Sequence, residues 1–296
     1  MDDRQLNHYF KNLTVWMNGS QRAPHKPLLI LFALGKLQRE NQRLIPYSEI
    51  DGKLTSLLRE FGPSRKSYHP NYPFWRLQKD HIWEIPGSQI LTTNKSGDVN
   101  KSDLIQHDIH GGLSKEVYHY LLKRRELIPK VAFRILDAHF EATLHEDILS
   151  AVGLSLEPYD KNKKKRDPEF REKVLSAYEY KCAVCNYNVR INNSLVGLEA
   201  AHIQWHKADG PDDVENGLAL CSLHHKLFDY GIFTIGKNHT FLISEKASGY
   251  GGFSDLLLQH HSQNLNRPIR TSYEPAIKYI DWHHSEVFKS PAREIV

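Results

Sequence analysis

The chain has 296 residues, of which 40% are hydrophobic and 25% are charged, and this balance is typical of a soluble globular protein of two domains. It contains no run of 18 apolar residues, which excludes a transmembrane helix, and the N-terminal "MDDRQLNHYF" lacks the pattern of a signal peptide, so we expect a cytoplasmic protein. The formal net charge of +4, with a sequence pI near 8.7, allows a nucleic-acid partner without requiring one.

The first half of the chain is predicted to be rich in helices. Three helices are expected, over residues 25–40, 48–62 and 129–153, from apolar residues at helical spacing and from prolines and glycines near their ends. Between the second and the third, "PFWRLQKDHIWEI" (73–85) is predicted to form two short strands around a turn. This half is therefore expected to combine helices with a small sheet.

A polar and strongly basic stretch, "YDKNKKKRDPEF" (159–170), marks the clearest domain boundary. We interpret it as a solvated linker, although the same composition is compatible with a nuclear localisation signal or with contacts to DNA phosphates. The expected organisation is an N-terminal domain over 1–155, a basic linker over 156–168 and a C-terminal domain over 169–296.

The second half is predicted to alternate helices and strands. A helix over 168–182 should be followed by a strand over 194–203, a turn and helix over 216–231, a hairpin over 233–244 and a terminal helix over 276–288. Together with the helix-rich first half, this pattern predicts an α+β protein.

The three cysteines of the chain all lie in the second half. Cys182 and Cys185 form one close pair, Cys221 and His224 form another, and residues 186–220 separate the two pairs. An odd number of cysteines argues against a disulfide framework, whereas two close pairs with two-residue gaps are typical of a tetrahedral zinc site. We therefore predict that these side chains bind a structural Zn²⁺; the alternative is a buried pair of free cysteines beside a chance histidine.

Between these pairs, "LEAAHIQWHKADGPDDVENGLALCSLHH" (198–225) contains three elements, "AHI", "NGLALC" and the start of "HHKLFD", in a fixed order. They resemble the HNH nuclease family, and in particular the branch found in bacterial restriction endonucleases, over roughly residues 170–245. The resemblance implies a ββα-metal fold that hydrolyses DNA phosphodiesters. By the same resemblance, His202 is the general base, Asn216 holds the loop that orients it, and His225 is a ligand of a catalytic Mg²⁺ or Mn²⁺.

The site departs from many HNH enzymes at the residue before the base, where Ala201 replaces an Asp or His that binds metal. Two carboxylates are candidates for that role. Asp229 lies four residues after His225 on the same helix face, and Glu199 lies two residues before Ala201 on the same side of a strand. Asp229 is slightly preferred, but a helix cap or a structural carboxylate remains an alternative for either residue.

The two adjacent histidines of "CSLHHKLFD" are expected to serve different metals. Neighbouring residues of a helix point about 100° apart, so one ion cannot readily use both. The spacing assigns His224 to the structural zinc with Cys221, and the resemblance assigns His225 to the catalytic ion.

In the N-terminal half, "RAPHKPLLILFAL" (22–34) and "NYPFWRLQKDHIWEI" (71–85) resemble the sulfur-binding domains of phosphorothioate-dependent restriction enzymes, over roughly residues 1–150. Such a domain implies double-stranded DNA with a phosphorothioate as the partner.

The residues in these segments suit that role. His25 and Lys26 precede a helix, and a helix N-terminus with a cation is an anion site. Sulfur is larger and a weaker hydrogen-bond acceptor than oxygen, so its pocket should be apolar, and Tyr72, Pro73 and Phe74 are predicted to form that surface. The predicted flanking phosphate contacts are Arg22, Arg65, Lys66 and Arg76.

The sequence therefore predicts a bacterial, modification-dependent (type IV-like) restriction endonuclease. A homodimer is expected, because a double-strand break needs two active sites. Three alternatives stay open: a reader of a modified base such as methylcytosine, which Tyr72, Phe74 and Trp75 do not exclude; a DNA-binding protein with a vestigial HNH fold; and a homing or colicin-type nuclease without modification dependence.

Overall fold

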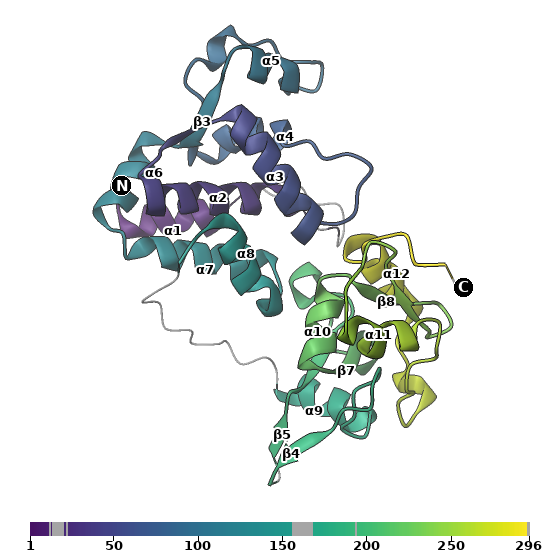
Figure 1. Ribbon diagram of the computed structural model, residues 1–296. Helices are drawn as coiled ribbons and strands as arrows, with labels where there is room; N and C mark the ends of the chain where they lie inside the picture. The colour runs from purple at the N-terminus through teal and green to yellow at the C-terminus, as the bar shows by residue number, and fades with distance from the viewer. Residues whose placement is uncertain (12, 14–20, 22, 156–167, 193, 295–296) are drawn as a thin grey trace. The chain divides into compact units, whose positions relative to one another are not determined.

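The computed structural model describes the chain except for residues 12, 14–20, 22, 156–167, 193 and 295–296 (Figure 1). The described residues divide into two compact units, one containing residues 23–155 and the other residues 168–294. The basic linker predicted over 156–168 lies outside the described residues except for Pro168, and Arg22 lies outside them as well. No helix within the described part of the chain is both long and apolar enough to cross a membrane.

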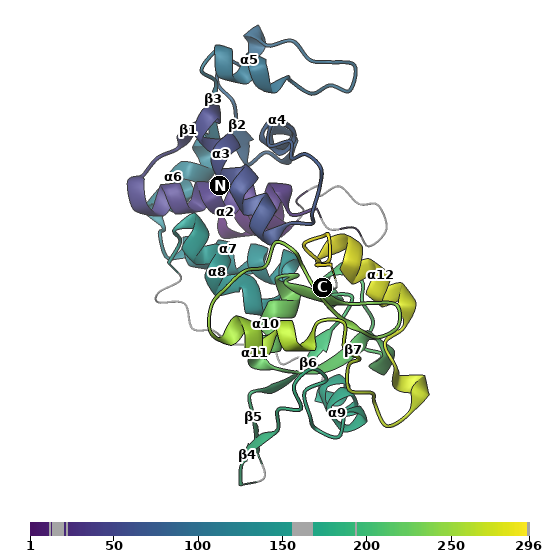
Figure 2. The same ribbon diagram turned by 45° about the vertical axis from the view of Figure 1, so that its right-hand side comes forward.

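The N-terminal unit is organised around helix α2 (His25–Glu40). Side chains on every face of α2 are buried, because α3 (Tyr47–Phe61), α7 (Leu127–His139) and α8 (His145–Val152) pack around it (Figure 2). The helix predicted over 25–40 is confirmed. The other elements of this unit are α1 (Asp3–Lys11), β1 (Leu44–Pro46), α4 (Asn71–Arg76), β2 (Trp83–Glu84), α5 (Lys101–Gln106), β3 (His110–Leu113) and α6 (Lys115–Lys123).

The small sheet of this unit has the order β1-β3-β2, and β3 pairs antiparallel with both neighbours. Gly112 of β3 permits this close pairing, since a Cβ there would lie 1.7 Å from the carbonyl oxygen of Arg43. Of the two strands predicted over 73–85, the first is wrong, because that stretch forms α4 and the 3₁₀ turn Leu77–Asp80. Pro73 suits the first turn of a helix and cannot donate to a sheet.

The single helix predicted over 129–153 is also wrong in its middle. It is two helices, α7 and α8, separated by an extended Phe140 with φ −137° and ψ 146°. The Phe140 side chain is fully buried, so tertiary packing of this ring overrides the helical periodicity.

A two-stranded hairpin forms the centre of the C-terminal unit. β6 (Leu198–His202) pairs antiparallel with β7 (Gly217–Cys221), and α9 (Pro168–Ala177) and α10 (Ser222–Asp229) both pack on it (Figure 2). The structure therefore places a strand where a turn was predicted before the second helix. Gly217 faces α9, because a Cβ at this position would lie 2.4 Å from a methyl group of Val174.

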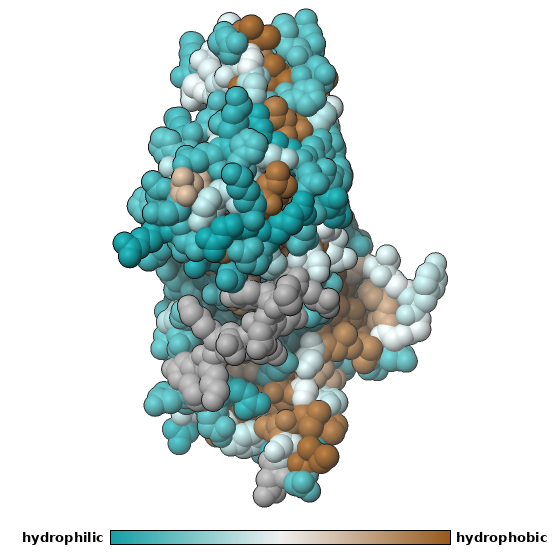
Figure 3. Space-filling view, turned by 90° about the vertical axis from the view of Figure 1, so that its left-hand side faces the viewer, coloured by the Kyte–Doolittle hydropathy of each residue, from teal (hydrophilic) through white to brown (hydrophobic). Residues whose placement is uncertain are grey.

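The predicted hairpin over 233–244 is confirmed by the pairing of β8 (Phe233–Ile235) with β9 (Phe241–Ile243), and the terminal helix is confirmed as α12 (Ile277–Glu286). The strand predicted over 194–203 is interrupted at Gly197, which has φ +66°. The remaining bounds in this unit are β4 (Val189–Ile191), β5 (Ser194–Val196) and α11 (Gly252–Leu256). The short hairpin β4–β5 exposes Val189, Ile191 and Val196, and apolar side chains are visible at this lower end of Figure 3.

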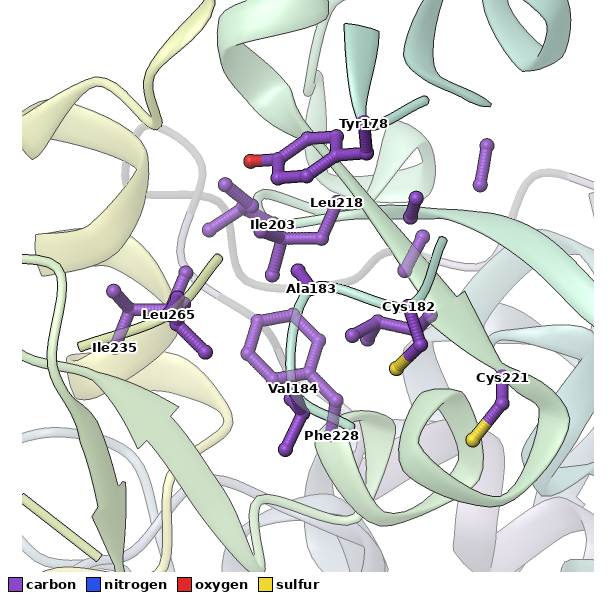
Figure 4. Packing of buried hydrophobic residues seen from close by; sticks show 14 of the residues in the cluster. Tyr178, Cys182, Ala183, Val184, Ile203, Leu218, Cys221, Phe228, Ile235 and Leu265 are labelled. Carbon is purple, nitrogen blue, oxygen red and sulfur yellow. The ribbon is translucent and has the colours of Figure 1, made fainter. Parts of the chain in front are cut away.

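The core of the C-terminal unit lies against α10. Figure 4 shows the ring of Phe228 beside Val184, with the sulfur atoms of Cys182 and Cys221 at the edge of the same cluster. The α+β class, with a helix-rich N-terminal part and a small sheet, is confirmed.

Candidate functional site

Three cysteines and one histidine meet at the end of the β6–β7 hairpin. The ligand atoms of Cys182, Cys185, Cys221 and His224 all lie within 4.8 Å of one another. A tetrahedral zinc ion with Zn–S bonds of about 2.3 Å requires ligand atoms about 4 Å apart. The cluster is therefore compatible with zinc.

The ring of His224 has the orientation that metal binding requires. Its Nε2 lies 2.9 Å from the carbonyl oxygen of Leu256, to which it must donate, so Nδ1 faces the sulfur atoms. Nδ1 is 3.2 Å from Sγ of Cys221 and 3.7 Å from Sγ of Cys182. Burial lowers the pKa of His224, but hydrogen bonds with these two sulfur atoms outweigh burial and raise it to about 10. Nδ1 is therefore directed at the sulfur atoms, as the ligand atom of a shared ion would be.

The predicted base, His202, is the last residue of β6 and is largely buried. Its Nε2 lies 2.7 Å from Oδ1 of Asp212, a residue that the sequence analysis did not single out. A second constraint comes from α9, where the ring of Phe170 stacks on the imidazole. The two ring centroids are 4.0 Å apart, and the angle between the ring planes is 13°. The ring of His202 is therefore held both at its edge and on its face.

Asn216 is fully buried and ties together the loop that follows β6. Its side-chain oxygen accepts a hydrogen bond from the backbone N–H of Gln204 (2.8 Å), and its amide donates to the carbonyl oxygens of Gln204 (3.0 Å) and Pro211 (2.9 Å). Its own backbone carbonyl accepts from the N–H of Ile203 at 2.9 Å. These bonds connect the residues directly after His202 with the segment that carries Asp212.

Both carboxylates considered for the catalytic ion contact His225. Nδ1 of His225 lies 2.6 Å from Oε2 of Glu199, and Nε2 lies 3.4 Å from Oδ2 of Asp229. His225 and Asp229 are almost completely buried, whereas the side chain of Glu199 is 40% exposed. Since the two carboxylates lie at different ring nitrogens, one ion could bind the imidazole together with only one of them, and that pair of an imidazole and a carboxylate suits Mg²⁺ or Mn²⁺.

Glu199 and His202 lie on opposite faces of β6, whereas His225 and Asp229 lie on α10. Side chains alternate along β6, so Glu199 and Ala201 project from one face and His202 from the other. The structure thus joins Glu199 and Asp229 to His225, and it joins His202 to Asp212.

In the N-terminal unit, the start of α2 is less positively charged than predicted. Burial, together with the nearby charges of Arg65 and His69, lowers the pKa of His25 to about 4, so His25 is neutral at neutral pH. Lys26 forms an ion pair with the buried Asp80, and its side chain is only 12% exposed. The free cation predicted at the start of α2 is therefore not observed. The imidazole of His25 is neutral at neutral pH, and the charge of Lys26 is paired with that of Asp80.

The surface predicted from "YPF" also needs correction. Pro73 is buried and Phe74 is fully buried, with its ring 5.0 Å from that of Tyr47, so both residues belong to the core. Gly111 makes room for Phe74, since a Cβ there would lie 2.5 Å from the phenyl ring. Of the three predicted pocket residues, only Tyr72 is partly exposed.

Tyr72 lies between two other polar side chains of its own segment. Its ring stacks on His69 with centroids 5.1 Å apart, and the guanidinium of Arg76 lies 5.0 Å from its centre. Arg76 is held in turn by two hydrogen bonds of 2.7 and 2.6 Å to the buried Asp98. The arginine therefore positions the tyrosine face, which the sequence analysis did not anticipate because nothing local connects residue 98 with this segment.

The predicted residues that do assemble are those before α4 and at the start of α2. The charges of Arg65 and His69 both lower the pKa of His25, and the ring of His69 also stacks on that of Tyr72. Arg65 and Lys66 are exposed in this segment. His69, which precedes "NYP" in the sequence, was missed although its place beside Tyr72 was a usable signal.

Substituting His25 should make the N-terminal unit less sensitive to acid. The unfolded chain binds a proton at this histidine near pH 6.5 and the folded chain near pH 4, so stability is lost as the pH falls between these values. The loss from this group should reach about 3 kcal/mol at pH 4. His25→Gln should remove it, as measured by hydrogen exchange of the α2 amides at several pH values. The exposed His119, changed to Gln, is the control; an equal pH response in both variants would contradict the burial effect.

Two family models match the chain. Residues 3–157 match the ScoMcrA-like DNA sulfur-binding domain, and residues 182–236 match the HNH endonuclease family. No curated protein matches.

Several solved structures are similar to the chain. The sulfur-binding domain of ScoMcrA complexed with phosphorothioated DNA is 23% identical (TM-score 0.44; 50% of this chain and 94% of that chain). The type IV phosphorothioation-dependent restriction endonuclease ScoMcrA is also 23% identical (TM-score 0.42; 49% and 31%), so the match spans less than a third of its length. The modification-dependent TagI restriction endonuclease is 20% identical (TM-score 0.30; 46% and 41%).

The family assignment rests on the sequence matches, since these TM-scores all lie below 0.5. The sulfur-binding model covers more than half of the chain, and the HNH model covers the Cys₃His cluster, the β6–β7 hairpin with its connecting loop, where His202 and Asn216 lie, and α10, where His225 lies. The chain belongs to the ScoMcrA-like DNA sulfur-binding domain family and joins that domain to an HNH endonuclease domain.

Proposed function

We propose that this protein is a modification-dependent restriction endonuclease of the bacterial cytoplasm. Its N-terminal domain would bind phosphorothioated double-stranded DNA, and its HNH domain would hydrolyse a phosphodiester nearby. The observation that carries the proposal is the presence of a DNA sulfur-binding domain and an HNH domain in one chain. The reader and the nuclease then act on the same DNA molecule.

The composition of the reader site favours sulfur over oxygen. A phosphate oxygen gains most from free cations and strong donors, whereas sulfur accepts hydrogen bonds weakly and prefers apolar contacts. Around Tyr72, Arg76 is bound to Asp98, and His25 is neutral at neutral pH. We assign the sulfur contact to the tyrosine face and the neutral imidazole, with the exposed Arg65 and Lys66 as flanking phosphate contacts.

In the nuclease domain, His202 would act as general base. It would take a proton from the attacking water, whose oxygen forms a bond to phosphorus while the bond from phosphorus to the 3′ oxygen breaks. Asn216 would keep the loop after β6 in place through its three side-chain hydrogen bonds.

Two metal sites are assigned to the chain's own ligands. Cys182, Cys185, Cys221 and His224 would hold a structural Zn²⁺. Separately, a divalent ion, Mg²⁺ or Mn²⁺, held by His225 and by the carboxylate at one of its two ring nitrogens, Asp229 or Glu199, would supply charge stabilisation at the departing 3′ oxygen.

A double-strand break requires two nuclease sites, so we propose that two chains act together on DNA. Sedimentation of the protein with and without a phosphorothioate duplex tests this, and a monomer that breaks both strands at a single site would contradict it.

The decisive measurement compares one duplex carrying sulfur or oxygen at a single phosphate. We expect binding to be at least about tenfold tighter with sulfur, which corresponds to about 1.4 kcal/mol. Tyr72→Ala and His25→Ala should reduce this ratio, measured by fluorescence anisotropy at fixed salt. The matched controls are the fully exposed Tyr250 and the exposed His119, each changed to Ala.

Equal affinities for sulfur and oxygen in the wild type would refute the sulfur preference. Tighter binding to a methylcytosine duplex would instead identify a reader of modified bases.

A further inference from the structure

We propose that Asp212 is the positioning residue of His202 and selects the tautomer in which this histidine accepts a proton. The proposal deepens the assignment of His202 as general base and rests on that proposed function. Its starting point is the contact of 2.7 Å between Oδ1 of Asp212 and Nε2 of His202.

The contact determines which ring nitrogen can act as a base. An ionised carboxylate only accepts hydrogen bonds, so Nε2 of His202 must carry the proton that is shared with Asp212. A neutral imidazole has a single N–H, and the lone pair of His202 is therefore on Nδ1. Asp212 thus directs proton acceptance to Nδ1, the nitrogen on the other edge of the ring.

The surrounding loop is built to hold this pair at a constant separation. Asn216 donates hydrogen bonds to the carbonyl oxygens of Pro211, directly before Asp212, and of Gln204, two residues after His202. The loop is also tightly closed at Gly210, where a Cβ would lie 1.9 Å from the Gln204 carbonyl oxygen. One buried side chain therefore positions both the base and its carboxylate partner.

The ring plane has a second constraint. Phe170 stacks on His202 at 4.0 Å, so the ring cannot turn without losing this contact. Rotation about the remaining axis is limited by the hydrogen bond to Asp212. The carboxylate and the phenyl ring together leave Nδ1 in a defined direction.

With Nδ1 of His202 as the proton acceptor, every bond and proton of the hydrolysis step is accounted for. A proton passes from water to Nδ1 of His202, the water oxygen bonds to phosphorus, and the bond from phosphorus to the 3′ oxygen breaks. The departing 3′ oxygen then takes a proton from solvent, and the imidazolium returns its own to solvent. While it exists, that imidazolium is stabilised by the negative charge of Asp212.

The first test is Asp212→Asn. An asparagine can donate to Nε2 through its amide, which allows the other tautomer and removes the negative charge. We expect the single-turnover cleavage rate to fall about 10²-fold or more, with unchanged affinity for the duplex. Asp212→Glu should recover part of the rate, and Asp213→Asn, at the exposed neighbouring position, should have no effect.

A double mutant separates positioning from a general structural effect. If Asp212 acts through His202, then Asp212→Asn should not slow cleavage further in a protein that already carries His202→Gln. Rate losses that multiply in the double mutant would overturn the proposal.

The last test does not depend on cleavage. In protein labelled with ¹⁵N-histidine, long-range proton–nitrogen spectra distinguish the two neutral tautomers, and the His202 signals are assigned by their absence in His202→Gln. We expect the Nε2–H form in the wild type and a mixture or the Nδ1–H form in Asp212→Asn. An unchanged tautomer would overturn the proposal even in an active enzyme. If Asp212→Asn changes the tautomer of His202 as expected but the wild-type protein cuts no DNA, the positioning role would be supported and the nuclease assignment refuted.

Discussion

His202→Ala should lower the rate of DNA cleavage about 10² to 10⁴-fold while leaving DNA binding unchanged. The loss is expected because the variant lacks the imidazole that would accept a proton from water. In the wild type this imidazole is held by its contacts with Asp212 and Phe170. Binding should persist because the reader residues lie in the N-terminal unit. Cleavage is measured in single-turnover reactions with a phosphorothioate duplex, and binding by anisotropy with the same duplex.

Two further variants make this experiment decisive. His202→Gln keeps more of the side-chain volume beside Phe170, so it should lose activity with a smaller effect on stability than alanine. His284→Ala changes an exposed histidine of α12 in the same unit and should keep full activity. Unchanged cleavage in either His202 variant would remove this residue as the base, and lost binding in both would indicate a folding defect instead.

His224→Ala and His225→Ala should have opposite effects although the two residues are neighbours. His224→Ala removes one of four ligands from the Cys₃His cluster, and binding energy at a structural zinc site is folding energy, so we expect a loss of more than about 3 kcal/mol. His225→Ala leaves all four cluster ligands in place. It should remain folded, lose cleavage, and cost no more than about 1–3 kcal/mol for the buried Asp229 carboxylate that it contacts.

The metal content gives the sharpest comparison between these variants. His225→Ala should retain one equivalent of zinc per chain, whereas His224→Ala should lose it and unfold at lower denaturant concentration. A strong chelator should destabilise the wild type and His225→Ala to the level of His224→Ala. Matching losses of zinc and stability in both variants would contradict the division of roles.

The Cys₃His cluster and helix α10, which carries His225, were predictable because both depend on short stretches of sequence. Paired ligands with two-residue gaps come together in any chain that forms the local turns, and the ligands of the two pairs meet wherever β6 and β7 pair. The bounds of α2 were predictable from Pro27 in its first turn and from the continuous apolar run that follows, which is buried on every face of the helix.

The failures share a different physical cause. The α4 segment has residues that favour strands, yet burial of Phe74 and the turn chemistry of Pro73 make it helical. Lys26 was predicted to be a free cation, but it forms an ion pair with Asp80 of a distant segment. Phe140 interrupts the helix predicted over 129–153 because its ring is buried. In each instance the partner is remote in sequence, so no local pattern reports it.

The sequence by itself determined the class of the protein and the members of the Cys₃His cluster, because motif spacing and local turns are properties of neighbouring residues. Only the tertiary structure decided what each side chain contacts. It paired His202 with Asp212, placed Glu199 and Asp229 on the two ring nitrogens of His225, and bound Arg76 to Asp98 beneath Tyr72. Protonation state and orientation depend on burial and on charges brought together by the fold, and these exist only when distant segments pack.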